Sequence, residues 1–210
     1  MGTSIIEPSI SRDVLQMEEI RKPALMKSLF ALGASYSAQE LSYTKILGQL
    51  FDAGNTVTLA HYMELLNNAN ILRALPKYSA NPVKIRQSSP RFMVYDTSLL
   101  VWAAGASRKR LLENPDDRGH LVESAVGAYL LARGKEEGFS VYWWRKKDRE
   151  VDFIIEKGKG SLTAIEVKSG RIKHINGSLE FKKLFPKAFS MIINNDNLED
   201  FLEGKIQLFL

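Results

Sequence analysis

Apolar residues in the first part of the chain recur at the spacing of helices. Leu25, Leu29 and Leu32 fall on one face of a helical projection, and a proline divides residues 11–33 into two short helices. Gly33 then offers a stop signal for the second helix. The pattern predicts a helical lead-in that ends by about residue 36.

The following segment has the pattern of two amphipathic helices and a strand pair. Ser42 is placed to cap the first helix, and a turn that contains Gly54 separates the two helices. The elements expected are helices over 42–50 and 56–68 and strands over 71–75 and 91–95. Helix-turn-helix plus hairpin predicts a winged helix over residues 37–103, with the polar, proline-containing stretch 76–90 as its wing.

The pattern changes after residues 104–118, a polar and basic stretch that we interpret as a connection. From there the sequence favours the order helix, three strands, helix, strand. The boundaries expected are 120–133, 140–145, 151–156, 162–168, 177–185 and 189–193. Residues 119–210 are therefore predicted to form a mixed sheet flanked by helices, and the chain as a whole an α/β (α+β) protein.

Composition limits the classes of protein that fit. The chain has 210 residues, of which 45% are hydrophobic and 25% charged, so an ordinary globular core is expected. It has no cysteine, no apolar run near bilayer length and no signal-peptide layout, which favours a cytoplasmic protein without a membrane partner. The net charge of +5 permits contact with nucleic acid but does not require it.

Candidate chemistry is concentrated in two of the expected strands. Asp152 interrupts an apolar run, and Glu166 and Lys168 are two residues apart, so a strand directs both of these side chains to one face. Two carboxylates and a lysine on adjacent strands can hold a divalent metal ion and stabilise a phosphoryl-transfer transition state. A plain same-face ion pair between Glu166 and Lys168 would leave the same pattern.

These residues resemble the D…ExK motif of PD-(D/E)xK nucleases, which have the restriction-endonuclease-like αβββαβ fold. The wider succession resembles the C-terminal region of a family of prokaryotic AAA-type ATPases, in which a winged helix and a nuclease-like domain follow a P-loop ATPase domain. The stretches that carry the resemblance are NTVTLAHYMELL at 55–66, RFMVYD at 91–96, GHLVES at 119–124, YWWR at 142–145, EVDF at 150–153 and IEVK at 165–168.

The resemblance implies a mechanism and a cofactor. Glu123, on the helix before the sheet, would join Asp152 and Glu166 in holding Mg²⁺ or Mn²⁺, and Lys168 would assist the attacking water during phosphodiester hydrolysis. The Gly-x-x-x-x-Gly-Lys-Ser/Thr phosphate loop is absent, so we expect no ATPase activity from this chain. An ATPase domain would then be an N-terminal partner within a longer protein.

Basic residues give candidate contacts to DNA. They lie in the wing and in the turn between the first two strands of the second domain: Lys77, Lys84, Arg86, Arg145, Lys146 and Lys147. The exposed face of the 56–68 helix lacks lysine and arginine, which makes it a poor recognition helix. Two functions stay open at this point, a metal-dependent nuclease module and a non-catalytic scaffold that binds DNA or a protein partner.

Overall fold

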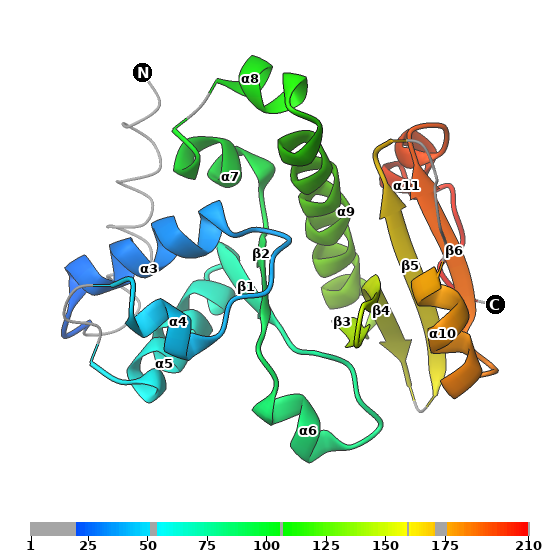
Figure 1. The fold of residues 1–210 in the computed structure, drawn as a ribbon, viewed down its shortest axis with the longest axis horizontal. Coiled ribbons are helices and arrows are strands. Elements are labelled where there is room, and N and C mark those ends of the chain that lie inside the picture. The colour runs from blue at the N-terminus through cyan, green and yellow to red at the C-terminus, as the bar shows by residue number, and fades with distance from the viewer. Residues whose placement is uncertain (1–19, 51–53, 106, 159, 171–175, 210) are drawn as a thin grey trace.

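Two sheets of different size organise the chain (Figure 1). The computed structural model describes residues 20–50, 54–105, 107–158, 160–170 and 176–209. An antiparallel pair is formed by β1 (Leu72–Leu75) and β2 (Arg91–Val94), and four further strands form a mixed sheet. The mixed α/β class predicted from the alternating patterns is confirmed.

Short helices surround the small sheet. In chain order they are α3 (Pro23–Ser35), α4 (Tyr43–Leu47), α5 (Thr56–Asn68), α6 (Pro82–Gln87), α7 (Thr97–Ala103) and α8 (Arg108–Glu113). Side-chain caps begin most of them, as predicted at Ser42, whose Oγ accepts a hydrogen bond from the N–H of Lys45 at 3.3 Å. Asn55 caps α5 in the same way through the N–H of Thr58 at 2.9 Å.

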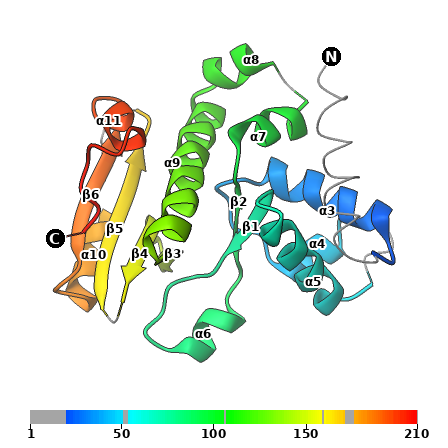
Figure 2. The same ribbon diagram turned by 180° about the vertical axis from the view of Figure 1, so that it is seen from behind.

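A long helix, α9 (Pro115–Glu137), lies between the small sheet and β5–β6 in both views (Figures 1 and 2). The side chain of Asn114 caps its start, and Gly138, with a φ of 74°, ends it in the left-handed conformation that glycine adopts without strain. Gly127 lets α9 approach β2 closely, because a Cβ atom there would lie 2.4 Å from Sδ of Met93. The helix therefore packs on both sheets.

The larger sheet follows the predicted order of elements. These are β3 (Phe139–Lys146), β4 (Arg149–Lys157), β5 (Ser161–Lys168), α10 (Asn176–Leu184) and β6 (Phe189–Asn194), followed by α11 (Leu198–Leu202). The strand order is β3-β4-β5-β6, with antiparallel pairing except between β5 and β6, which are parallel. Helix α9 packs on one face with Phe153 and Ile165, and α10 packs on the other with Ile154 and Phe181.

The buried side chains form separate clusters around the two sheets. Helix α5 contributes Leu59 and Leu66 to a cluster with α3 and the small sheet, whereas Ile165 of β5 belongs to the cluster under α9. Leu75 and Met93 of the small sheet also pack into the α9 cluster, so the two parts share an apolar contact. The domain limits given above stay a prediction.

The structure corrects several predicted elements. The predicted wing, residues 76–90, contains helix α6, and the predicted connection, residues 104–118, contains α8 and the first turn of α9. Helices α7 and α11 were not predicted. The first lead-in helix falls mostly on residues 1–19, outside the described residues. Across the described residues, no helix combines the length and apolar character that crossing a bilayer requires.

Candidate functional site

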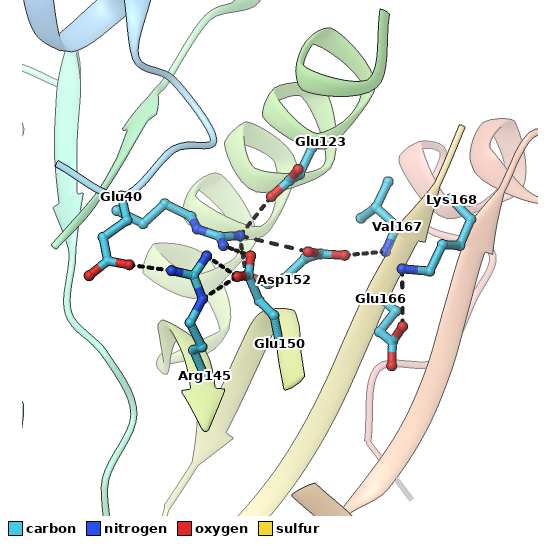
Figure 3. Close-up of polar contacts among 9 residues, drawn as sticks. Glu40, Glu123, Arg145, Glu150, Asp152, Glu166, Val167 and Lys168 are labelled. Atoms are coloured by element: carbon cyan, nitrogen blue, oxygen red, sulfur yellow. Dashed lines mark hydrogen bonds and ion pairs between the residues drawn. The ribbon is translucent and has the colours of Figure 1, made fainter. Parts of the chain in front are cut away.

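The candidate site begins where β4 and β5 stop pairing. Their ladder runs as far as Phe153 opposite Ile165. At the next position the side chain of Asp152 replaces the main-chain pairing, because its Oδ2 accepts a hydrogen bond from the main-chain N–H of Val167 at 2.7 Å. The other oxygen of Asp152 is thereby turned away from Val167, as Figure 3 shows for the labelled side chains.

Arg91, at the start of β2, brings a guanidinium group into this region from the small sheet. Only 3% of its side chain is exposed. Its Nη1 lies 2.7 Å from Oε1 of Glu123 and 3.7 Å from Oδ1 of Asp152, and its Nη2 pairs with Glu150. Its guanidinium carbon also lies 5.0 Å from the ring centre of Trp143, at cation–π distance. Three carboxylates from two elements therefore converge on one arginine.

A second arginine extends these contacts toward the amino-terminal part. Nε of Arg145 donates to Oε2 of Glu150 at 2.6 Å, and its Nη1 lies 2.6 Å from Oε2 of Glu40. A main-chain bridge joins Glu40 to Arg91. We call this set the Arg91 network, and its members are Glu40, Arg91, Glu123, Arg145, Glu150 and Asp152 (Figure 3).

Glu166 and Lys168 form a separate pair on β5. As the alternation predicts, they share a face: Nζ of Lys168 lies 3.1 Å from Oε2 of Glu166. Oε1 of Glu166 accepts from the N–H of Ser178 at 2.6 Å, at the start of α10. The side chain of Glu166 is 3% exposed and that of Lys168 is 29% exposed. Both oxygens of Glu166 are therefore engaged within the fold.

Burial dominates the titration of the inner carboxylates. It raises the pKa of Glu123 to about 8, with a further increase from Asp152 and an opposing effect of Arg91 and Lys168. Burial likewise raises the pKa of Asp152, although Arg91 and the N–H of Val167 act against the rise. These two side chains hold protons more tightly than exposed carboxylates do.

This arrangement does not fit a divalent metal ion as it stands. Within the described ranges, no group of three or more aspartate, glutamate, histidine or cysteine side chains is placed to bind a single ion. The space that Glu123 and Asp152 face contains the guanidinium group, and Glu166 turns to Ser178 and Lys168. The joint metal site of Glu123, Asp152 and Glu166 stays a prediction.

A polar hollow of about 460 Å³ opens beside the Arg91 network. Arg91, Glu123, Arg145 and Glu150 line it, together with Glu40 and neighbouring residues of the amino-terminal part. Asp152, Glu166 and Lys168 do not line it. The hollow therefore gives access to the outer side of the network and not to the β5 pair.

The structure brings the two predicted basic segments together. Lys77, Lys84, Arg145 and Lys146 all line a hollow of about 300 Å³. They meet because residues 76–78 run along β3, where the N–H of Tyr78 donates to the main-chain oxygen of Trp143 at 2.7 Å and Lys77 bridges to Trp143. We call this surface the basic hollow.

The other predicted contacts to nucleic acid differ in their surroundings. Lys147 is exposed at the β3–β4 turn, outside the lining of the basic hollow, and the side chain of Arg86 lies outside the described part of the structure. Trp143 and Trp144 are buried on opposite faces of the sheet, which removes both rings as platforms for stacking bases. Lys146 pairs with Glu180 at 2.9 Å.

Sequence reasoning missed Arg91, Glu40 and Glu150 as members of the site. One signal was present, because Arg91 opens the apolar run that forms β2 and a buried charge requires counter-charges nearby. The sequence does not show which carboxylates supply them, since Glu150 is 59 positions away along the chain.

Comparison with known proteins adds two families. Residues 3–110 match the family described as Domain of unknown function (DUF8612), and residues 118–208 match Domain of unknown function (DUF4143). Uncharacterized proteins of Mycobacterium bovis and Mycobacterium tuberculosis are each 28% identical over 171 residues, which cover 81% of this chain and 38% of each relative. The chain thus spans less than half the length of these relatives. No solved structure matches it.

Proposed function

We propose that this chain, which belongs to the family described as Domain of unknown function (DUF8612), is a DNA-associated module of an AAA-type ATPase. The winged helix would be formed by α4, α5 and the β1–β2 hairpin, and the nuclease-like domain by the elements from α9 to β6. The DUF4143 match supports this assignment, because that domain is commonly a C-terminal part of AAA-ATPase-associated proteins. The ATPase partner would be an N-terminal P-loop domain of the same longer protein.

The basic hollow is the observation that carries DNA association. Its lysine and arginine residues come from the wing and from the β3–β4 region, so a single phosphate backbone could contact both parts of the chain. Lys84 and Lys146 are exposed, while Lys77 is half-buried with Nζ 5.4 Å from the ring centre of Trp143. Since phosphate contacts dominate non-specific affinity, binding here would tolerate many sequences.

We propose that the nuclease-like site serves as a non-catalytic scaffold in the conformation described. Asp152 and Glu166 each accept a main-chain N–H, and their remaining oxygens face Arg91 and Lys168. Side chains engaged in this way hold the sheet, α9 and α10 together. A binding module requires a surface that contacts phosphate and carboxylates that are paired within the fold.

The test measures DNA affinity and its salt dependence. Fluorescence anisotropy with labelled duplex and single-stranded DNA should show binding that weakens with salt. The double variant Lys77→Gln/Lys84→Gln should weaken it and lower the salt slope by about 0.9 for each phosphate that the protein no longer neutralises. Lys205→Gln is the matched control, since Lys205 pairs with Asp200 and Glu203 outside the basic hollow. If the wild type binds neither DNA, the proposed association with DNA is wrong.

A metal-dependent nuclease is the second candidate, favoured by the separation of β4 and β5 at Asp152 with Lys168 on the neighbouring strand. It predicts cleavage of DNA or RNA with Mg²⁺ or Mn²⁺, and loss of cleavage in Asp152→Asn, Glu166→Gln and Lys168→Met. Incubation of mixed substrates with millimolar Mg²⁺ or Mn²⁺, read on gels, decides between the two. Intact substrates in every lane would leave the scaffold as the function.

A further inference from the structure

We propose that Arg91 is the resident cation of the carboxylate cluster, and that its guanidinium group excludes divalent cations from Glu123, Glu150 and Asp152. Packing of the small sheet against α9 and binding of a metal ion would then be mutually exclusive. The proposal goes beyond DNA association and does not depend on it. The carboxylates resemble those of a nuclease site, yet the buried side chain of Arg91 lies among them.

The geometry places the guanidinium group where an inner ion would have to lie. Nη1 of Arg91 contacts Glu123 at 2.7 Å, approaches Oδ1 of Asp152 to 3.7 Å and the main-chain oxygen of Asp152 to 3.5 Å, while Nη2 pairs with Glu150. A Mg²⁺ ion needs oxygen ligands at about 2.0–2.1 Å in near-octahedral geometry. The carboxylates cannot surround such an ion while the guanidinium group lies between them.

The charges of the Arg91 network make the arginine necessary in the absence of another cation. Among the described residues, the network has four carboxylates and only two guanidinium groups. Arg145 reaches only the outer members, Glu40 and Glu150. Without Arg91, Lys168 would be the remaining cation that acts on Glu123 and Asp152, and a divalent ion would relieve the repulsion between these carboxylates in their ionised forms.

The position of Arg91 in β2 links this exclusion to the arrangement of the two parts of the chain. Met93, two residues further on, packs against Gly127 of α9, and Oγ of Ser37 lies 2.7 Å from Oγ of Ser124. Arg91 cannot withdraw far while these contacts hold. A partner that moves the small sheet away from α9 would therefore expose the carboxylates to ions.

The test compares direct binding of Mn²⁺ to the full chain and to Arg91→Gln, by electron paramagnetic resonance of free Mn²⁺ and by thermal unfolding in EDTA or Mn²⁺. The wild type should show no saturable binding at the inner carboxylates. Arg91→Gln should bind Mn²⁺ saturably, at least about tenfold more tightly than any non-specific binding by the wild type, and its melting temperature should rise with the ion. Arg133→Gln, which loses a surface pair with Glu137 far from the network, should behave as the wild type does.

Two further variants distinguish the possible outcomes of this comparison. Adding Asp152→Asn to Arg91→Gln should remove the new binding, and Arg91→Lys, with a smaller cation, should give an intermediate affinity. The proposal is overturned if the folded Arg91→Gln chain binds Mn²⁺ no better than the wild type. It is equally overturned if the wild type binds Mn²⁺ through Asp152, or if Arg91→Gln stays unfolded in millimolar Mn²⁺ while folded Arg91→Lys matches the wild type.

Discussion

Glu123 makes folding depend on pH at the scale of a single residue. Its folded-state pKa of about 8 exceeds that of an ordinary glutamate, so the native state binds a proton that the unfolded state releases. The stabilisation from this group is therefore complete below the ordinary glutamate pKa and is lost as the pH rises toward 8. The slope contributed by one such group is at most about 1.4 kcal/mol for each pH unit.

The substitution Glu123→Gln tests this effect. It keeps an oxygen that can accept from Nη1 of Arg91 but removes the titration. Urea unfolding between pH 5 and pH 8 should show the wild type losing stability relative to the variant as the pH rises. If the free energies of unfolding of the two proteins change in parallel between pH 5 and pH 8, Glu123 is ionised throughout this range.

The sequence predicts the pairing of some site residues but not the partners of others. The shared face of Glu166 and Lys168 follows from strand alternation, which is a local property, and the 3.1 Å contact confirms it. The partners of Asp152 depend on where β2 lies relative to β4, and no local pattern encodes that placement. Arg91 was consequently found only in the folded chain.

At the scale of elements, Gly177 controls how α10 docks on the sheet. A Cβ atom at this position would lie 1.7 Å from the main-chain oxygen of Glu150, so any larger residue forces the helix and strand apart. The hydrogen bond from Ser178 to Glu166 would be lost with that shift. The start of α10 thus supports the pair on β5.

We expect Gly177→Ala to destabilise the protein by about 1–3 kcal/mol or more, as overpacking does elsewhere. The control is Gly119→Ala in α9, where a Cβ atom would meet only Oγ of Ser169 at 3.4 Å. That control should be neutral or gain up to about 1 kcal/mol from helix propensity. Thermal unfolding measures both, and equal melting temperatures for the two variants would contradict the proposed role of Gly177.

The elements that sequence missed are short. Helices α6, α7, α8 and α11 have five to seven residues each, too few to show a clear helical period. Pro82 looks like a breaker in the wing, yet it occupies the first position of α6, where its fixed φ suits a helix. The long α9 and the strands β3 to β5 were found because their patterns extend over more residues.

For the whole molecule, α9 should couple the stability of the two parts. Gly127→Val would place a branched side chain against Met93 and push β2 away from α9. Hydrogen exchange should then increase in β1 and β2 while the centre of β4 and β5 stays protected. The control is Gly119→Val, which makes the same change in helix propensity without that contact. Unchanged exchange in β2 would show that the two parts are stable independently.

A second expectation for the whole chain concerns nucleotides. Because the sequence has no phosphate-binding loop, ATP with Mg²⁺ should leave the melting temperature unchanged, and no phosphate should be released. A thermal shift and a phosphate-release assay measure these quantities. A shift with ATP that is absent with Mg²⁺ alone would point to a nucleotide site that lacks this loop.

The contact between residues 76–78 and β3 has a consequence for self-association. The N–H of Trp143 donates to the main-chain oxygen of Pro76 at 3.2 Å, and the main-chain oxygen of Trp143 accepts from Tyr78, so this segment satisfies hydrogen-bonding groups at the edge of the larger sheet. An uncovered border strand recruits strands from other chains. The amino-terminal part thus covers a section of the edge strand β3, and we expect residues 118–208 produced alone to aggregate through that strand.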